Sequence, residues 1–319
     1  MVARVVLVGH GLAGKVFHEP FLRSTPGLDL VAIARSADVP TMWDHRPDLI
    51  VLATPNSTHV PLALEAVRRG VAVVVDKPLG LTAAEAEPLV TLAESEGVPL
   101  GVFHNRRWDG DFLTARALLA GGSLGDLVLW ESRFERWRPD VGDPGKEAAR
   151  GGVWMDLGPH LVDQALVAVG PVRSVHAVLR AVRPGAAYDD DAQVTLLHAS
   201  GAQSLLVIST LASQQGPRFR LLGTAASWVK HGLDGQEAVL RGEPVVPEDG
   251  GRLGTDEVFE QLPPRPGTWE AFYSGVATCL AGDGPMPVTG REGLEVLRVM
   301  DAARASSRTG QVVALSPSP

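Results

Sequence analysis

Residues 4–14 read Arg4-Val5-Val6-Leu7-Val8-Gly9-His10-Gly11-Leu12-Ala13-Gly14, a short apolar run followed by glycines with the spacing G-x-G-x-x-G. The run predicts a buried β-strand, and a helical stretch follows the last glycine. In this arrangement the amides at the start of the helix can bind a pyrophosphate. The stretch therefore predicts a parallel α/β domain that binds a dinucleotide. The alternative is a glycine-rich turn in another kind of α/β protein.

Four further apolar strands follow in the first third of the chain. We expect them at residues 28–34, 48–53, 71–75 and 99–103, with helices between most of them. Thr82 and Glu85 form a capping box for one helix, which reaches Gly97. Alternating strands and helices predict a doubly wound parallel sheet (a Rossmann fold), in which ligands bind beyond the carboxyl ends of the strands.

The second predicted strand ends in Arg35-Ser36, roughly 20 residues after the glycines, where the residue that contacts the adenine ribose is expected. An acidic residue at this place accepts hydrogen bonds from a free 2′-hydroxyl, whereas an arginine pairs with a 2′-phosphate. Arg35 therefore favours NADP over NAD. In the alternative interpretation Arg35 stacks on the adenine or faces solvent.

Two more loops at strand ends carry polar residues. Thr54-Pro55-Asn56-Ser57-Thr58-His59 follows the strand at 48–53, and Asp76-Lys77-Pro78 follows the strand at 71–75. A lysine at the carboxyl end of a strand, beside a bound cofactor, can have a lowered pKa and hydrogen-bond a reacting oxygen. The alternative is a surface lysine in an ordinary turn.

Residues 151–163, Gly-Gly-Val-Trp-Met-Asp-Leu-Gly-Pro-His-Leu-Val-Asp, place a carboxylate four residues before an imidazole. Gly158 disfavours a settled helix and Pro159 suits a first helical position, so we expect Asp156 in a loop and His160 in the first turn. An imidazole with an unperturbed pKa of about 6.5 can take and return a proton at neutral pH, and a nearby carboxylate fixes its tautomer. The pair predicts a general acid/base site; the alternative is a capped helix with an ordinary buried histidine.

Length and composition limit the possible classes of protein. A chain of 319 residues predicts two domains, which we place at residues 1–121 and 122–319. The net charge is −8, and no basic cluster exceeds a pair such as Arg106-Arg107, which argues against nucleic acid or an anionic membrane as a partner. A single cysteine, Cys279, fits a reducing compartment. With no leader sequence or membrane span expected, the sequence predicts a cytoplasmic protein.

After Gly121-Gly122-Ser123 the pattern changes to long alternating runs. They predict a C-terminal α/β domain with a large, mainly antiparallel open sheet. The runs lie at residues 127–137, 172–182, 192–199, 203–211 and 219–223. The Pro/Gly-rich stretch 242–267 predicts an ordered loop, residues 268–281 and 291–307 predict amphipathic helices, and residues 311–315 predict a last strand or tail.

Taken together in this order, the glycine loop, Thr54-Pro55-Asn56 with His59, Asp76-Lys77-Pro78, and Asp156-x-Gly158-x-His160 with Asp163 resemble the glucose-fructose oxidoreductase/inositol dehydrogenase (Gfo/Idh/MocA) family. Three further stretches are similar to a subgroup with NADP-dependent scyllo-inositol dehydrogenases: Gly14-Lys15-Val16-Phe17-His18, Asn105-Arg106-Arg107-Trp108-Asp109 and Lys230-His231-Gly232-Leu233-Asp234-Gly235-Gln236-Glu237.

The resemblance implies Lys77, Asp156 and His160 as the catalytic residues. It also implies contacts to NADP or NAD from a larger set: Gly9, Gly11, Leu12, Ala13, Gly14, Arg35, Ser36, Thr54, Pro55, Asn56, His59, Asp76, Lys77, Pro78, Asn105 and Trp154. The implied partner is a small polyol or sugar, and the implied assembly is a homodimer or homotetramer through the C-terminal sheet.

The chain departs from the family pattern in two places. Asp76 stands where the family commonly has glutamate, and residues 36–47 are short for the family, so we expect a loop there. The expected reaction is the reversible oxidation of a secondary alcohol by NAD(P). Two alternatives on the same fold are a non-catalytic nucleotide-sensing regulator and a hydrolase that uses bound NAD to cleave glycosidic bonds. We expect no metal site, because Asp156 and His160 lack an evident third ligand.

Overall fold

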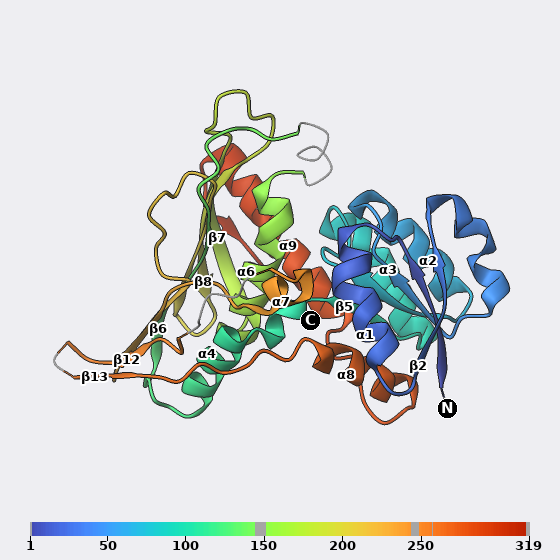
Figure 1. Ribbon diagram of the computed structural model, residues 1–319. Coiled ribbons are helices and arrows are strands. Elements are labelled where there is room, and N and C mark those ends of the chain that lie inside the picture. The colour runs from blue at the N-terminus through green and yellow to red at the C-terminus, as the bar shows by residue number, and fades with distance from the viewer. Residues whose placement is uncertain (1, 144–150, 244–248, 257, 317–319) are drawn as a thin grey trace. The chain divides into compact units, whose positions relative to one another are not determined.

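The structure is a computed structural model, and it describes residues 2–143, 151–243, 249–256 and 258–316 (Figure 1). The chain forms two compact units. Unit 1 comprises Met1–Trp108, Gln236–Pro244 and Thr268–Arg298, and unit 2 comprises Asp109–Gly235, Val245–Gly267 and Val299–Pro319. The boundary at residue 121 stays a prediction.

Unit 1 contains a five-stranded parallel sheet in the order β2-β1-β3-β4-β5. Its strands are β1 (Ala3–Val8), β2 (Leu28–Ala34), β3 (Leu49–Leu52), β4 (Ala72–Asp76) and β5 (Leu100–Phe103). The side chains of 5–8, 49–52 and 73–75 are 0% exposed. Strands covered on both faces need apolar residues at consecutive positions, which explains their unbroken apolar runs. The predicted doubly wound sheet is confirmed.

Helical segments follow most strands of unit 1, and Figure 1 shows α1, α2 and α3 beside the sheet. In chain order they are η1 (Gly14–His18), α1 (Glu19–Ser24), η2 (Ser36–His45), η3 (Asn56–Thr58), α2 (His59–Arg68), α3 (Ala83–Glu96), η4 (Asn105–Trp108), α7 (Gln236–Arg241), α8 (Glu270–Leu280) and the first part of α9 (Gly290–Thr309).

Helix α3 begins and ends where the sequence predicts. The backbone N–H of Glu85 donates to Oγ1 of Thr82 at 3.2 Å, and the Glu85 carboxylate accepts from the N–H of Leu81 at 3.0 Å. Gly97 ends the helix with φ 66°, a left-handed conformation that glycine adopts at low cost. The capping box therefore satisfies N–H groups that have no partner inside the helix.

The expectation of a loop at residues 36–47 is wrong, because η2 is a 3₁₀ helix. Its apolar residues find partners within unit 1. The side chain of Met42 is 1% exposed, and the guanidinium of Arg69 lies 4.4 Å above the ring of Trp43. Burial of Met42 and the contact of Trp43 with Arg69 give this short segment the tertiary contacts that hold a helical turn.

Unit 2 contains a nine-stranded sheet in the order β13-β12-β11-β10-β6-β9-β8-β7-β14. All pairs are antiparallel except β6 and β9, so the predicted mainly antiparallel sheet is confirmed. The strands are β6 (Leu127–Glu135), β7 (Val172–Arg180), β8 (Asp191–His198), β9 (Gln203–Ser209), β10 (Phe219–Gly223), β11 (Ser227–Lys230), β12 (Arg252–Gly254), β13 (Phe259–Gln261) and β14 (Val313–Ala314). Within the predicted loop 242–267, residues 244–248 and 257 lie outside the described residues, while β12 and β13 are short strands.

One face of this sheet packs against α6 (Val153–Val169), and α4 (Gly110–Ala120) also belongs to unit 2. Trp130, Phe134, Leu206 and Ile208 on β6 and β9 are at most 1% exposed. These side chains belong to the core of the unit. None of the helices in the described ranges is long and apolar enough to span a bilayer.

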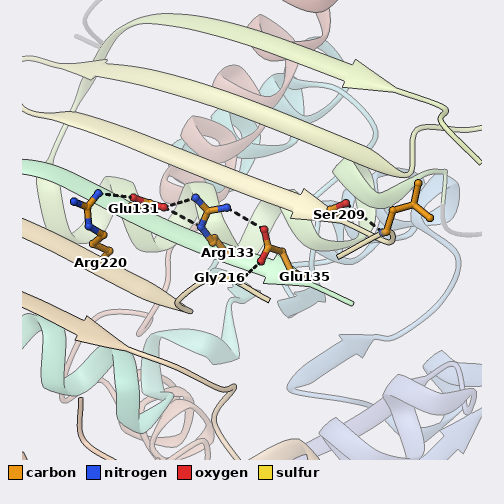
Figure 2. Close-up of polar contacts among 7 residues, drawn as sticks. Glu131, Arg133, Glu135, Ser209, Gly216 and Arg220 are labelled. Atoms are coloured by element: carbon orange, nitrogen blue, oxygen red, sulfur yellow. Dashed lines mark hydrogen bonds and ion pairs between the residues drawn. The ribbon is translucent and has the colours of Figure 1, made fainter. Parts of the chain in front are cut away.

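The alternate positions of β6 carry a row of charges (Figure 2). The guanidinium of Arg133 bonds the carboxylates of Glu131 and Glu135, two residues before and after it. Arg220 on the neighbouring strand β10 lies 3.4 Å from Glu131, and the N–H of Gly216 donates to Glu135 at 2.6 Å. Because side chains in a strand alternate between faces, Trp130 and Phe134 lie on the other face of β6 from these charges.

Candidate functional site

The five parallel strands of unit 1 bring all the predicted nucleotide residues except Trp154 to one sheet edge. Carboxyl ends of parallel strands lie at the same edge, and each strand here leads into one of these groups. The glycine loop follows β1, Arg35 follows β2, Thr54 to Asn56 follow β3, Lys77 and Pro78 follow β4, and Asn105 follows β5. Unit 1 therefore brings together predicted site residues that lie far apart in the sequence.

The glycine loop packs so tightly on the end of β3 that side chains are excluded. Gly9 has φ 96°, and a Cβ there would lie 2.2 Å from the carbonyl oxygen of Ala53. A Cβ on Gly14 would lie 2.3 Å from the carbonyl oxygen of Gly9. At Gly11, by contrast, a Cβ would meet no atom within 4 Å. The backbone at Gly11 is thus open to a group from outside the protein, which fits the close approach of a dinucleotide pyrophosphate.

Arg35 lies next to this loop. The N–H of Gly9 donates to the carbonyl oxygen of Ala34 at 2.9 Å, so the residue after Ala34 adjoins the start of the loop. The Arg35 side chain is exposed, as a side chain that reaches toward a ribose phosphate should be. Ser36 begins η2, and its side chain lies outside the described part of the chain.

The buried ring of His59 joins the loops after β3 and β4. Its Nδ1 lies 2.8 Å from the carbonyl oxygen of Pro78, and its Nε2 lies 2.9 Å from the carbonyl oxygen of Thr54. The Thr58 hydroxyl donates to Oγ1 of Thr54 at 2.7 Å. Residues that the sequence places in separate loops are therefore held together, although His59 does this through backbone oxygens.

Asp76 directs its carboxylate to the backbone of the candidate catalytic lysine. Its Oδ1 accepts a hydrogen bond from the N–H of Lys77 at 2.8 Å. Burial of the carboxyl by itself would raise its pKa, but the adjacent His18 and the charges of Lys77 and His59 lower the pKa of Asp76. An ionised carboxylate therefore lies beside Lys77 at neutral pH. The side chain of Asn105 is buried in η4 at 7% exposure.

The acid and the imidazole of unit 2 both lie inside α6, so the predicted helix start is wrong. The helix begins at Val153, before Asp156, and Pro159 lies within it. The helix starts earlier because Asp189, in a loop distant in the sequence, binds its first N–H groups. Its Oδ2 accepts from the N–H of Trp154 at 2.7 Å, and its carbonyl oxygen accepts from the N–H of Val153 at 2.8 Å. These bonds cap a turn that the local sequence does not favour.

The helical spacing nevertheless keeps Asp156 and His160 together. Residues four apart lie on the same face of a helix one turn from each other. The ring of His160 is 6% exposed and makes an edge-on contact with Phe134, with ring centroids 6.3 Å apart. Phe134 in turn packs under the guanidinium of Arg218 at 4.3 Å, and Arg218 donates to Oε1 of Gln164 at 2.8 Å. The candidate base therefore lies in a packed, ordered part of unit 2.

A cavity of about 420 Å³ opens in unit 2 beside the first turn of α6. Its wall combines carboxylates, guanidinium groups, an aromatic hydroxyl and a threonine hydroxyl. These groups include Asp156, Arg136, Tyr188, Asp189 and Thr210. A mainly apolar wall with several polar groups, at this size, fits a small molecule that carries hydroxyl groups.

Trp154, a predicted nucleotide contact, is a core residue of unit 2. Its indole is 1% exposed, its Nε1 donates to the carbonyl oxygen of Met300 at 3.3 Å, and its ring packs on Gly158. A Cβ at Gly158 would lie 2.8 Å from that ring. Its contact with the nicotinamide or the substrate stays a prediction.

Two contributors were missed by the sequence analysis. Asp189 caps α6 from 35 residues away, and the acidic run Asp189-Asp190-Asp191 between two strands was the available signal. His18 lies 3.8 Å from Asp76 and bonds Tyr273, and its place in the stretch Gly14–His18 was the signal. Among the described residues, no group of three or more His, Cys, Asp or Glu side chains could hold a metal ion.

Comparisons with known proteins agree with the fold of each unit. The family model described as "Oxidoreductase family, NAD-binding Rossmann fold" matches residues 36–104, and the model described as "GFO/IDH/MocA C-terminal domain" matches residues 112–229. The uncharacterized oxidoreductase YdgJ of Escherichia coli (strain K12) is 39% identical over 96% of both chains.

Two further comparisons cover nearly the whole length. The scyllo-inositol 2-dehydrogenase (NADP(+)) IolW of Bacillus subtilis (strain 168) is 33% identical over 98% of this chain and 96% of its own. A solved structure from Yersinia pestis is 36% identical, with a TM-score of 0.91 over 99% of this chain and 98% of the other. Together with the matched motifs, these relatives place the chain in the Gfo/Idh/MocA family, and the protein is an oxidoreductase with an NAD-binding Rossmann fold.

Proposed function

We propose that this protein oxidises a secondary alcohol of a polyol or sugar with NADP, and reduces the corresponding ketone in the reverse direction. The observation that carries the proposal is Lys77, which follows a strand at the same sheet edge as the glycine loop. Asp156 and His160 on α6 of unit 2 support it, and Asp156 lines a cavity of that unit. The B. subtilis relative is named an inositol dehydrogenase, so an inositol is the first substrate to test.

In the proposed reaction the alcohol carbon loses a hydride and its hydroxyl loses a proton, which gives a ketone and one reduced cofactor. When bound, the nicotinamide supplies the acceptor for the hydride at C4. His160 takes the hydroxyl proton, Asp156 orients the imidazole, and Lys77 donates a hydrogen bond to the same oxygen. These roles for Lys77, Asp156 and His160 are proposals that rest on the family motifs and on the placement of each residue within its own unit.

The proposal is tested by following the absorbance of the reduced cofactor with a panel of inositols, aldoses and related diols, each offered with NAD and with NADP. We expect net reduction of the cofactor that depends on the polyol. A hydrolase that recycles bound NAD would release sugar without this signal. No change in absorbance with any alcohol, and none with the matching ketones and reduced cofactor, would overturn the proposal.

Replacing Arg35 with serine is expected to reduce the preference for NADP over NAD by about ten- to a hundredfold, because a charged hydrogen-bond pair with the 2′-phosphate is lost. The ratio of kcat/KM for the two cofactors measures this effect. The rate with NAD should change little, which serves as the internal control. If the wild type already turns over faster with low concentrations of NAD, the role of Arg35 is wrong.

Two other expectations stay predictions. The homodimer or homotetramer would use the sheet of unit 2, and its test is light scattering of the purified protein. The cytoplasmic location rests on the single cysteine.

A further inference from the structure

The buried ring of His18 lies between two polar groups of unit 1 that the proposed reaction does not use. Its Nδ1 lies 2.6 Å from the hydroxyl of Tyr273 on α8, and its Nε2 lies 3.8 Å from Oδ1 of Asp76. The side chain is 0% exposed. Burying a polar ring costs free energy unless polar groups lie opposite its nitrogens. Here both ring nitrogens face such groups.

Aromatic side chains fix the position of this ring. Phe103 at the end of β5 packs on His18 with centroids 4.4 Å apart, and Phe272 of α8 packs edge-on against Phe103 at 4.9 Å. The Tyr273 hydroxyl then fixes the rotation of the ring about its own axis. The direction of Nε2 toward Asp76 is therefore set by packing and by one hydrogen bond.

The arrangement also determines where the proton lies. An ionised carboxylate only accepts hydrogen bonds, so we place a proton on the Nε2 that faces Asp76, and an Nδ1 without a proton accepts from the Tyr273 hydroxyl. Burial, together with the nearby charge of Asp76, raises the pKa of the Tyr273 phenol well above its usual value. The phenol keeps its proton and can act as that donor.

The same carboxylate oxygen faces both the imidazole and the catalytic lysine. Oδ1 of Asp76 accepts from the backbone N–H of Lys77 at 2.8 Å. Nε2 of His18 lies 3.8 Å from the same oxygen, beyond hydrogen-bond distance, so this contact is electrostatic. Rotation of this carboxylate would release the Lys77 N–H. A group that holds the carboxylate therefore also holds the backbone from which the Lys77 side chain extends.

We propose that His18, fixed by the Tyr273 hydroxyl, is a positioning residue for Lys77 and acts through the carboxylate of Asp76. The inference deepens the proposed function and rests on the role of Lys77 in it. It also gives a reason for the aspartate at this position: the short side chain keeps the carboxylate at the end of β4, where both the His18 ring and the Lys77 N–H reach it.

The groups that face Asp76 make the positioning of Lys77 dependent on pH. They are His18 from η1, Lys77 next to it in the chain, His59 from α2 and Tyr273 from α8. Burial acts to raise the pKa of Asp76, and contact with His18 is the largest of the influences that lower it. Without His18 the pKa of Asp76 rises, so this carboxyl takes up its proton at a higher pH than in the wild type.

The test compares His18→Leu, His18→Gln and Tyr273→Phe with the wild type over a range of pH. A glutamine amide can occupy the place of Nε2 and donate to Asp76, whereas leucine cannot. We expect H18L to lower kcat on the order of ten- to a hundredfold with little change in KM for the cofactor, since small displacements of a catalytic group have effects of this size. The acid limb of its pH profile should move to higher pH, and H18Q should recover much of both losses.

A matched control separates positioning from the general cost of altering a buried histidine. His198 in unit 2 is also 0% exposed and bonds the Gly170 carbonyl and the Ser204 hydroxyl. His198→Leu should lower the melting temperature without moving the acid limb. Asp76→Asn supplies a double-mutant cycle: if His18 acts through Asp76, H18L adds little to the loss of turnover in D76N.

The outcomes distinguish this inference from the proposed function. If Lys77→Met abolishes turnover while H18L and Y273F leave both kcat and the acid limb unchanged, the role of His18 is wrong and that of Lys77 stands. If K77M turns over normally, the proposed role of Lys77 fails. Should H18L not fold, Y273F and H18Q decide the question. NMR of protein with labelled histidine gives an independent result: we expect a proton on Nε2 of His18, and a proton only on Nδ1 would overturn the inference.

Discussion

Replacement of His160 by alanine is expected to lower kcat by about 10²- to 10⁴-fold, the usual contribution of proton transfer by a positioned side chain. The loss should appear in kcat more than in KM for the cofactor, because the imidazole acts on the reacting hydroxyl. Steady-state rates of polyol oxidation measure it. A substrate with deuterium at the reacting carbon shows whether the chemical step limits the variant.

The control for this variant is His176→Ala, because His176 lies exposed on β7. Its turnover should equal that of the wild type. Because His160 is buried against Phe134, H160A also needs a thermal melt to show that it remains folded at the assay temperature. A folded H160A protein with undiminished turnover would rule out His160 as the base.

Replacement of Lys77 by methionine is expected to lower kcat on the order of 10²- to 10³-fold, since a donor directed at the developing negative charge on oxygen is lost. Methionine keeps the length of the side chain and removes the charge. Methionine also retains the backbone N–H that donates to Asp76, and a thermal melt checks that the variant remains folded. Rates in both directions with a polyol and its ketone measure the effect.

Lys77→Arg is the matched variant for charge. Arginine keeps the positive charge but places it on a longer, planar group, so its activity should stay well below that of the wild type. Full activity of K77R would mean that charge alone is sufficient. Equal activity of K77M and the wild type would remove Lys77 from the mechanism.

The sheet of unit 1 could be predicted because its signals are local. Each strand is an unbroken apolar run, and the glycine loop directly follows β1. The order of the motifs along the chain then identified the residues at the carboxyl edge. Capping of α3 was predictable for the same reason, since Thr82 and Glu85 are three residues apart.

The start of α6 and the surroundings of Asp76 could not be predicted in this way. The cap on α6 comes from Asp189, and the ring that faces Asp76 is held by Tyr273, 255 residues beyond His18 in the chain. Such pairs leave no periodicity in the sequence. The helical segment η2 was missed because its residues have a weak preference for helix. Burial of Met42 and the cation contact to Trp43 outweigh that weak preference.

Unit 1 is built from chain segments that are far apart in the sequence, and this affects how it folds during synthesis. Residues 268–298 belong to the unit, and Phe272 and Tyr273 among them pack against Phe103. A ribosome that has released only the first 108 residues has therefore produced five strands but not the aromatic side chains that cover the end of β5. The packing at the end of β5 is therefore completed only after Phe272 and Tyr273 have emerged, although domains generally fold from the N-terminus during synthesis.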